Sequence, residues 1–330
     1  MKYNYTFFVN NRRKSLLRLF YFIFKYSKIF FFRKYYLDIL SFYKILKYSG
    51  HPVVVECLEQ GSKKLGLNFN FYRYDNNFNE IAVVNSGIEN LEMCIRKKKE
   101  GIIKFIAAGP NLVVLPNEHN SILSNEYIDM VITPSKWVSQ TYIRAEPKIS
   151  KKIYEWCSGV DHNYWIDKKK KRKFITFYIK YSAGPIPKNI GDYINFVKFL
   201  GYIPKIIEYN KYNGNKFKKI LNESILLVYF SNHESQGLAT AEAWSCNTPT
   251  LIWNNQETII NNFKMKSSCC PYLTKECGNF FKDLNEFKET FKKTIINYNE
   301  YNPRKWIINN LTFKLSVKRL NNLIKNKIEN

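Results

Sequence analysis

The chain has 330 residues, 45% of them hydrophobic, so it is long enough and apolar enough for two packed domains. Its 52 Lys and Arg against 27 Asp and Glu give a formal net charge of +25, which suggests nucleic acid or an anionic membrane as a partner. The charge is spread along the chain, with one dense run at 168–173 and no zinc-finger or aromatic RNA-binding signature, and this pattern argues against nucleic acid as the partner.

The seven cysteines are an odd number, and their spacing matches no common zinc pattern. A chain of this length does not need disulfides for stability. No cleavable signal peptide with a small-residue cleavage site is evident at the start. We therefore expect a reducing, cytoplasmic setting.

Residues 1–48 are expected to form a separate N-terminal segment that is basic, aromatic and helical. Its apolar run, 15–32, is a poor transmembrane candidate because a spanning helix needs about 20 mostly uncharged residues. The cations in and beside it lie near one helical face: Lys14, Arg18, Lys25 and Lys28. That pattern suits a helix lying on the cytoplasmic face of an anionic membrane. It suits equally a helix packed on the protein with its Lys stems reaching outward.

Strand and helix patterns alternate from there to residue 165. Short apolar runs predict strands at 43–48, 68–74, 81–84, 102–107 and 127–133. The fourth strand is expected to break at Gly109-Pro110, with a further apolar run at 112–115. Helices are predicted at 53–66, 88–99 and 134–145. This alternation predicts a parallel, doubly wound sheet for a first domain at 49–165.

A second domain of the same kind is predicted at 166–300. Its strands are expected at 174–179, 203–208, 225–230 and 249–253. Helices are expected at 189–200, 215–221, 237–246 and 283–297. A terminal pair of helices is predicted at residues 301–330.

Two carboxylates, Glu234 and Glu242, are separated by seven residues between two of these strands. Glu234 is expected in the loop at the carboxyl end of a strand, and Glu242 in the helix that follows. Open α/β sheets bind ligands at that edge, where free N–H groups of a helix N-terminus meet anions. A carboxylate suits vicinal diols, because each oxygen accepts hydrogen bonds. The alternative is an ordinary pair of solvated glutamates.

The segment around these glutamates resembles the donor-binding motif of retaining GT-B glycosyltransferases (glycosyl transferases group 1 type). The shared features are Glu-x7-Glu, a Gly three residues after the first Glu, and a Cys-x-x-Pro turn into an apolar strand. The resemblance implies two Rossmann-like domains that face a cleft. It places Glu234 near the donor sugar and Glu242 on the ribose hydroxyls. The N–H groups of the intervening loop would meet phosphate or sugar oxygens: Ser235, Gln236, Gly237 and Leu238.

Other segments resemble the same family. Residues 131–137 resemble its strand-to-helix step in the first domain, and 158–165 its entry into the second, without the Pro before Gly159. Asp161 is expected to cap or orient that linker. Residues 270–273 and 278–281 resemble a late strand and the turn after it. The terminal helices of the family cross back to the first domain.

The family also has an Arg and, five residues later, a Lys that neutralise the donor diphosphate. Here Lys180 stands where the Arg is expected, and Lys188 follows eight residues on. A Lys can hold phosphate as a point charge, although it lacks the bidentate fork of Arg. Both are donor-binding candidates by resemblance, and surface lysines are the alternative in so Lys-rich a chain.

His119 is a further catalytic candidate, because the family often has a His of the first domain on the donor sugar. It follows an apolar run and a Pro-Asn-Glu turn, although a lone loop His is more often simply solvated. His51 and Glu118 are other candidates near the expected cleft. No Asp-x-Asp occurs, so we expect chemistry without a metal or cofactor.

The resemblance implies transfer of a sugar, with retention, from a nucleoside diphosphate sugar to an acceptor hydroxyl. The departing phosphate would then take the acceptor's proton. The basic apolar N-terminus suggests a lipid-linked or envelope glycan as acceptor. Two alternatives stay open. One is a GT-B relative with other chemistry, such as a sugar-nucleotide epimerase or an inactive homologue. The other is a nonenzymatic basic module that binds anionic membrane or nucleic acid.

Overall fold

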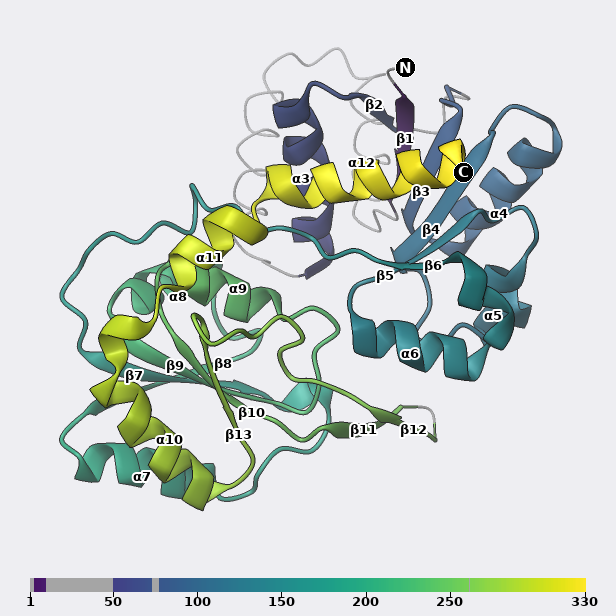
Figure 1. The fold of residues 1–330 in the computed structure, drawn as a ribbon. Coiled ribbons are helices and arrows are strands. Elements are labelled where there is room, and N and C mark those ends of the chain that lie inside the picture. The colour runs from purple at the N-terminus through teal and green to yellow at the C-terminus, as the bar shows by residue number, and fades with distance from the viewer. Residues whose placement is uncertain (1–2, 10–49, 73–76, 261) are drawn as a thin grey trace, which may run out of the picture.

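The computed structural model describes residues 3–9, 50–72, 77–260 and 262–330, which form two α/β domains side by side (Figure 1). The N-terminal domain is built on a six-stranded sheet with the order β2-β1-β3-β4-β5-β6. The C-terminal domain is built on a five-stranded sheet with the order β13-β10-β9-β7-β8. Neighbouring strands are parallel throughout both sheets. The predicted class of two Rossmann-like domains is confirmed.

The N-terminal domain has helices on both faces of its sheet. Its strands are β1 (Asn4–Phe8), β2 (Asn68–Phe71), β3 (Ile81–Ser86), β4 (Phe105–Asn111), β5 (Met130–Thr133) and β6 (Ile153–Glu155). Its helices are α3 (Gly50–Leu65), α4 (Ile88–Lys99), α5 (Glu118–Ser121) and α6 (Lys136–Ala145), with short 3-10 helices at Ile122–Ser124 and Pro147–Lys152.

The C-terminal domain repeats this plan. Its strands are β7 (Phe174–Lys180), β8 (Ile203–Glu208), β9 (Ser224–Ser231), β10 (Thr250–Trp253) and β13 (Gly278–Phe281), and β11 (Glu257–Ile260) and β12 (Phe263–Lys266) form a separate antiparallel hairpin. Its helices are α7 (Ile190–Phe199), α8 (Gly214–Asn222), α9 (Leu238–Ser245) and α10 (Leu284–Ile296), with 3-10 helices at Tyr181–Ala183 and Tyr298–Glu300. Two terminal helices follow, α11 (Pro303–Asn310) and α12 (Phe313–Glu329).

The central strands are buried on both faces, which explains why they are continuous apolar runs rather than alternating ones. In β3, Ile81 and Val83 enter one core, which also contains residues of α3 and α12. Ala82 and Val84 enter the core on the other face of the sheet, with residues of α4 and α6. The sheet of the C-terminal domain is likewise covered on both faces, by α8, α9 and α11 on one side and α7 and α10 on the other.

The strand order of the second sheet reverses beside β7. Strand β7 pairs with β8 on one side and with β9 on the other, so the chain winds outward in both directions from it. The last residue of β7, Lys180, is in register with Ser231, the last residue of β9. In open α/β sheets ligands bind outside the carboxyl ends of the strands at this reversal. The topology therefore predicts a ligand site beside Lys180 and the loop after β9.

The chain passes between the domains twice, at neighbouring places. The linker at Val160 donates its backbone N–H to Leu311 O over 2.8 Å and forms a bridge with Thr312. A Cβ at Gly159 would lie 2.4 Å from Thr312 O, so only glycine allows this approach. Helix α12 then packs on α3 of the N-terminal domain, where Phe313 and other apolar side chains of α12 enter the core. The predicted boundaries at 48, 165 and 300 stay predictions.

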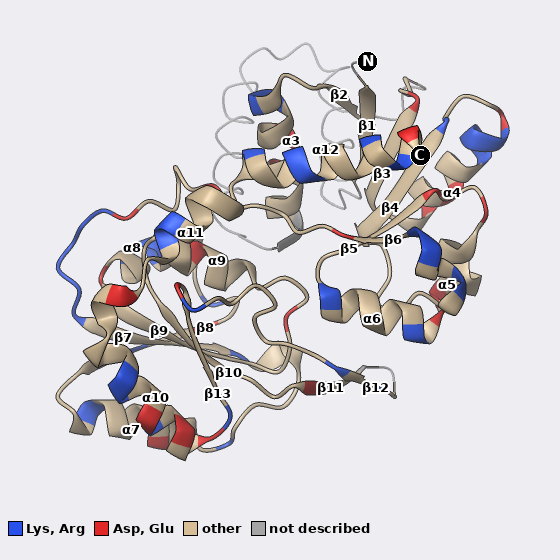
Figure 2. Cartoon of the chain, viewed as in Figure 1, with Lys and Arg blue, Asp and Glu red and all other residues tan. Residues whose placement is uncertain are grey.

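Part of the predicted N-terminal segment is a strand. Residues 4–8 form β1, which lies between β2 and β3, and no strand was expected there. The remainder of the segment, with the predicted helix at 15–32 and the predicted strand at 43–48, lies outside the described residues. Within the described ranges, no helix is both long and apolar enough to cross a membrane. Lys and Arg residues occur on helices and loops of both domains (Figure 2).

Two predicted strands need correction. Strand β4 does not break at Gly109-Pro110 but runs through it to Asn111. Gly109 makes this possible, because a Cβ there would lie 2.2 Å from Ile132 O on neighbouring β5. No strand forms at 112–115 or 270–273. The late strand is instead 278–281, which was expected to be a turn and pairs with β10.

Candidate active site

An ion pair occupies the reversal point of the second sheet. The Lys180 ammonium lies 2.8 Å from Glu234 Oε1, and their side chains are 19% and 12% exposed. Lys180 ends β7, and Glu234 stands three residues after β9, as the sequence predicts. Lys180 Nζ also lies 4.9 Å from the centroid of the Tyr209 ring, a cation–π contact. The two charges thus meet at the edge where a sheet of this kind binds ligands.

Glu234 is held by its surroundings rather than solvated. Its Oε1 also accepts hydrogen bonds from Tyr229 OH at 2.7 Å and Ser231 Oγ at 3.0 Å. Its backbone N–H donates to Ser268 O over 2.9 Å. Among the described residues, none donates to Oε2. One carboxylate oxygen is therefore engaged by the protein, and the other can accept a hydrogen bond from a ligand.

Glu242 is buried in α9, with 2% of its surface exposed. Burial raises the pKa of Tyr212, and the Glu242 carboxylate is the next cause of that rise. Burial likewise raises the pKa of Tyr178, where the charges of Glu234 and Glu242 both add to the rise. The negative charges of both glutamates therefore raise the pKa values of the same two tyrosines, Tyr178 and Tyr212. Neither glutamate is the solvated surface residue of the alternative interpretation.

The loop between the glutamates starts helix α9 and contacts the linker. Gly237 is the N-cap, with φ +80, a backbone conformation that favours glycine. Gln236 Nε2 donates to Ser158 O over 2.7 Å, and the Ser158 N–H donates back to Gln236 Oε1 over 3.1 Å. Leu238 packs on the core of the N-terminal domain, whereas Ser235 is exposed. The Gln236 side chain is thus engaged in joining the two domains, which leaves backbone N–H groups as its contribution to a ligand.

Within the described ranges, the other sequence candidates make no ion pair or hydrogen bond with Lys180 or Glu234. Lys188 is exposed in the loop before α7. His119 is exposed in α5 with φ 52, and no hydrogen bond or ion pair within the described ranges joins it to Glu234 or Lys180. Glu118 accepts the backbone N–H groups of Val114 and Leu115 at 3.1 and 3.2 Å, which is a structural role. The His51 side chain lies outside the described residues.

Asp161 orients the linker, as expected from the sequence. Its Oδ1 accepts the backbone N–H groups of Asn163 and Tyr164 at 3.1 and 3.2 Å. This pattern caps the turn that leads from the linker into the C-terminal domain.

Two aromatic residues beside Glu234 were not predicted as part of the site. Trp137, in α6 of the N-terminal domain, donates its Nε1–H to Glu234 O over 3.0 Å. Its ring meets His233 edge-on, with centroids 6.1 Å apart. His233 Nδ1 lies 3.2 Å from Thr258 Oγ1, and burial lowers the pKa of His233. The only sequence signals were the place of Trp137 at the start of a predicted helix and the position of His233 next to Glu234.

The arrangement combines groups that can hold a charged polyol. Lys180 supplies a positive charge, Glu234 Oε2 supplies a hydrogen-bond acceptor, and the N-terminus of α9 supplies backbone donors. Trp137 and the Ser158 linker bring the N-terminal domain to the same loop.

Comparison with known proteins places the chain by its fold. No protein-family model matches the sequence, and no curated protein matches it. A glycosyltransferase from Rickettsia africae ESF-5 superposes with a TM-score of 0.53 at 10% identity, over 100% of this chain and 99% of that one. Anabaena Alr3699/HepE, in complex with UDP and glucose, gives 0.52 at 10% identity, over 98% and 99%. The lipopolysaccharide outer core galactosyltransferase WaaB gives 0.51 at 12% identity, over 83% and 80%.

The first two of these likenesses cover 98% or more of the chain, and so both of its sheets. At such low identity they establish the architecture. The chain therefore has the GT-B fold, the two-domain fold of the glycosyltransferase structures that it resembles.

Proposed function

We propose that the protein is a glycosyltransferase that moves a sugar from a nucleoside diphosphate sugar to an acceptor hydroxyl. The observation that carries the proposal is the Lys180–Glu234 pair at the reversal point of the second sheet, with Glu234 Oε2 left to accept a hydrogen bond. A cation and a carboxylate at that edge match the two parts of such a donor, a diphosphate and a polyhydroxylated sugar.

Each site residue has a role in this proposal. Lys180, Lys188 and the N–H groups of Ser235, Gln236, Gly237 and Leu238 stabilise the negative charge that develops on the departing diphosphate, the largest electrostatic demand of the reaction. Glu234 accepts hydrogen bonds from the hydroxyls of the donor sugar, and Glu242 accepts hydrogen bonds from the ribose hydroxyls. His119 is kept as the donor-sugar contact from the N-terminal domain. The resemblance supports retention, with the departing phosphate taking the proton of the acceptor.

A panel of nucleotide sugars with wild type and Glu234→Gln tests the proposal. Gln keeps the size of the side chain but removes the charge and half of the acceptor capacity, so transfer should fall about 100-fold. The matched control is Glu208→Gln, because Glu208 also pairs with a lysine, Lys211, at 2.6 Å in the same domain. Undiminished transfer in Glu234→Gln would refute the site. Chromatography of the products separates transfer from epimerisation.

The acceptor proposal is a lipid-linked or envelope glycan at an anionic membrane surface. It rests on the basic apolar run at 15–32. Truncating the segment is not a clean test, because β1 is an interior strand of the sheet. Co-sedimentation with phosphatidylserine vesicles should instead compare wild type with a variant in which Lys14, Arg18, Lys25 and Lys28 are all Gln. Equal binding of both proteins would argue against the membrane proposal.

A further inference from the structure

Three donors converge on a single oxygen of Glu234. Lys180 Nζ, Tyr229 OH and Ser231 Oγ lie 2.8, 2.7 and 3.0 Å from Oε1. A carboxylate oxygen has about two lone-pair directions, so Oε1 is saturated. The opposite oxygen, Oε2, receives no hydrogen bond from the described residues. The Glu234 side chain is thus held in one rotamer by contacts to only one of its two carboxylate oxygens.

These donors differ in how fully they are committed to Glu234. Ser231 has one hydroxyl proton, and its oxygen also lies 3.1 Å from His233 O, a competing acceptor. Lys180 is the cation that the proposed function assigns to the diphosphate, and two phosphate groups would compete with Glu234 for it. Tyr229 OH has no second partner among the described residues. Of the three donors, it is the one for which neither the described residues nor the proposed diphosphate offers a competing acceptor.

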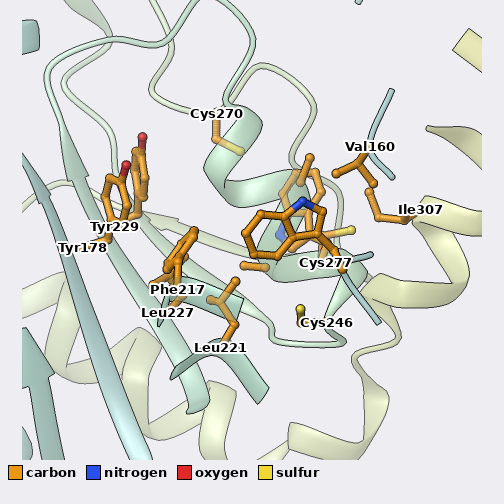
Figure 3. Packing of buried hydrophobic residues seen from close by; sticks show 14 of the residues in the cluster. Val160, Tyr178, Phe217, Leu221, Leu227, Tyr229, Cys246, Cys270, Cys277 and Ile307 are labelled. Atoms are coloured by element: carbon orange, nitrogen blue, oxygen red, sulfur yellow. The ribbon is translucent and has the colours of Figure 1, made fainter. Parts of the chain in front are cut away.

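The Tyr229 ring is held so that its hydroxyl cannot turn away. The side chain is 1% exposed, and its ring stacks on that of Tyr178 with centroids 4.8 Å apart and planes 15° apart (Figure 3). Tyr178 OH bonds to Tyr212 OH at 2.8 Å instead of to Glu234. Burial raises the pKa of Tyr229, and the Glu234 charge adds to the rise, so the phenol keeps its proton.

We propose that Tyr229 is a positioning residue that holds Glu234 by Oε1 and so presents Oε2 to the donor sugar while Lys180 turns to the diphosphate. The inference rests on the proposed glycosyl transfer. It assigns Tyr229 no contact with substrate. Its effect is exerted through Glu234 alone.

Tyr229→Phe tests the inference, because it removes one hydroxyl and keeps the stacked ring. A hydrogen bond to a charged group is lost, so kcat should fall about 10- to 100-fold. The KM for the nucleotide sugar should stay unchanged, since Lys180 and the α9 N-terminus still bind the diphosphate. In a Glu234→Gln background the same substitution should cause little further loss, because residues that act as a unit are not additive.

Tyr178→Phe is the matched control, because it removes an equally buried hydroxyl from the stacked partner without touching Glu234. It should keep wild-type kcat. Equal losses in both variants, or failure of Tyr229→Phe to fold, would show a packing role and overturn the inference. Additive losses in the Glu234→Gln background would show that Tyr229 acts independently of Glu234 and would also overturn it. Wild-type activity in Tyr229→Phe would overturn it while leaving the proposed function standing. Absence of transfer by wild type with every donor would overturn both.

Discussion

The indole N–H of Trp137 donates to the backbone carbonyl of Glu234 over 3.0 Å, although the two residues are 97 positions apart and belong to different domains. A side chain of the N-terminal domain thus fixes the loop of the C-terminal domain that carries the central carboxylate. Tyr272 OH and Pro134 O make a second contact between the same regions at 2.6 Å. The relative placement of the domains therefore bears directly on the geometry of the site.

Replacing Trp137 with Phe should lower kcat/KM about fivefold, because one hydrogen bond of about 1 kcal/mol to the Glu234 loop is lost. Steady-state kinetics with the active nucleotide sugar measures the effect. Trp253→Phe is the control, since its indole N–H donates to Lys282 O over 2.9 Å within the C-terminal domain. A loss of similar size in the control would show that the interdomain contact has no special effect.

Lys180→Ala should weaken nucleoside diphosphate binding about 10- to 100-fold, because the cation nearest Glu234 is removed. Lys188→Ala should have a smaller effect, since that side chain is exposed and its charge is screened. Calorimetric titration with UDP, ADP and GDP compares the two variants with wild type. If Lys188→Ala weakens binding more than Lys180→Ala does, the assignment of the diphosphate to Lys180 is wrong.

The stability of the fold should decrease as pH falls below about 6.5, in part because of His233. Burial lowers the pKa of His233 below its ordinary value, so at mildly acidic pH the unfolded chain binds a proton that the folded chain does not. The contribution of His233 to the free energy of unfolding is complete above about pH 6.5. It is lost as the pH falls to the lower pKa that His233 has in the folded protein. Burial lowers the pKa of His162 as well, so His233→Gln should remove only part of the decrease.

Urea unfolding at pH 7.5 and pH 5.5 measures that change in the free energy of unfolding. Each histidine can change the free energy of unfolding by at most about 1.4 kcal/mol per pH unit. His119→Gln is the control, because His119 is exposed. A decrease as large in His233→Gln as in wild type would exclude a contribution from His233.

Removal of divalent metals with EDTA should leave glycosyl transfer unchanged. The sequence has no Asp-x-Asp metal motif, and the proposed site meets the diphosphate with lysine charges and a helix N-terminus. Initial rates before EDTA, after EDTA and after added Mg²⁺ check this. A rate that collapses with EDTA and returns with Mg²⁺ would contradict the prediction.

Gly61→Ala should destabilise the chain by about 1–3 kcal/mol, because overpacked cores cost that much. A Cβ at Gly61 in α3 would lie 2.4 Å from Val317 Cγ2 and 2.6 Å from Phe313 O in α12. Gly191→Ala is the matched control in a helix, since a Cβ there meets nothing within 4 Å. It should be neutral or stabilising by up to about 1 kcal/mol. Thermal unfolding measures both, and equal melting temperatures would disprove the tight α3–α12 contact.

The sequence by itself determined the local plan of the C-terminal domain. The apolar run before Glu234 is strand β9, and α9 starts after Gly237, as predicted. Asn247, the residue after the predicted helix at 237–246, has φ 58, a helix-ending conformation that asparagine tolerates. Such signals depend on backbone conformation and on periodicity over a few residues, so they can be read without knowing the rest of the fold.

Only the tertiary structure decided which side chains meet. Lys180 and Glu234 are 54 positions apart and become an ion pair because β7 and β9 are neighbours in register. Strand β1 was missed because its pairing with β2 and β3 joins residues more than 60 positions away. The contacts of Tyr229 and Trp137 with Glu234 follow from sheet order and domain packing. Local sequence cannot encode such contacts, since their energy comes from neighbours that only the folded chain brings together.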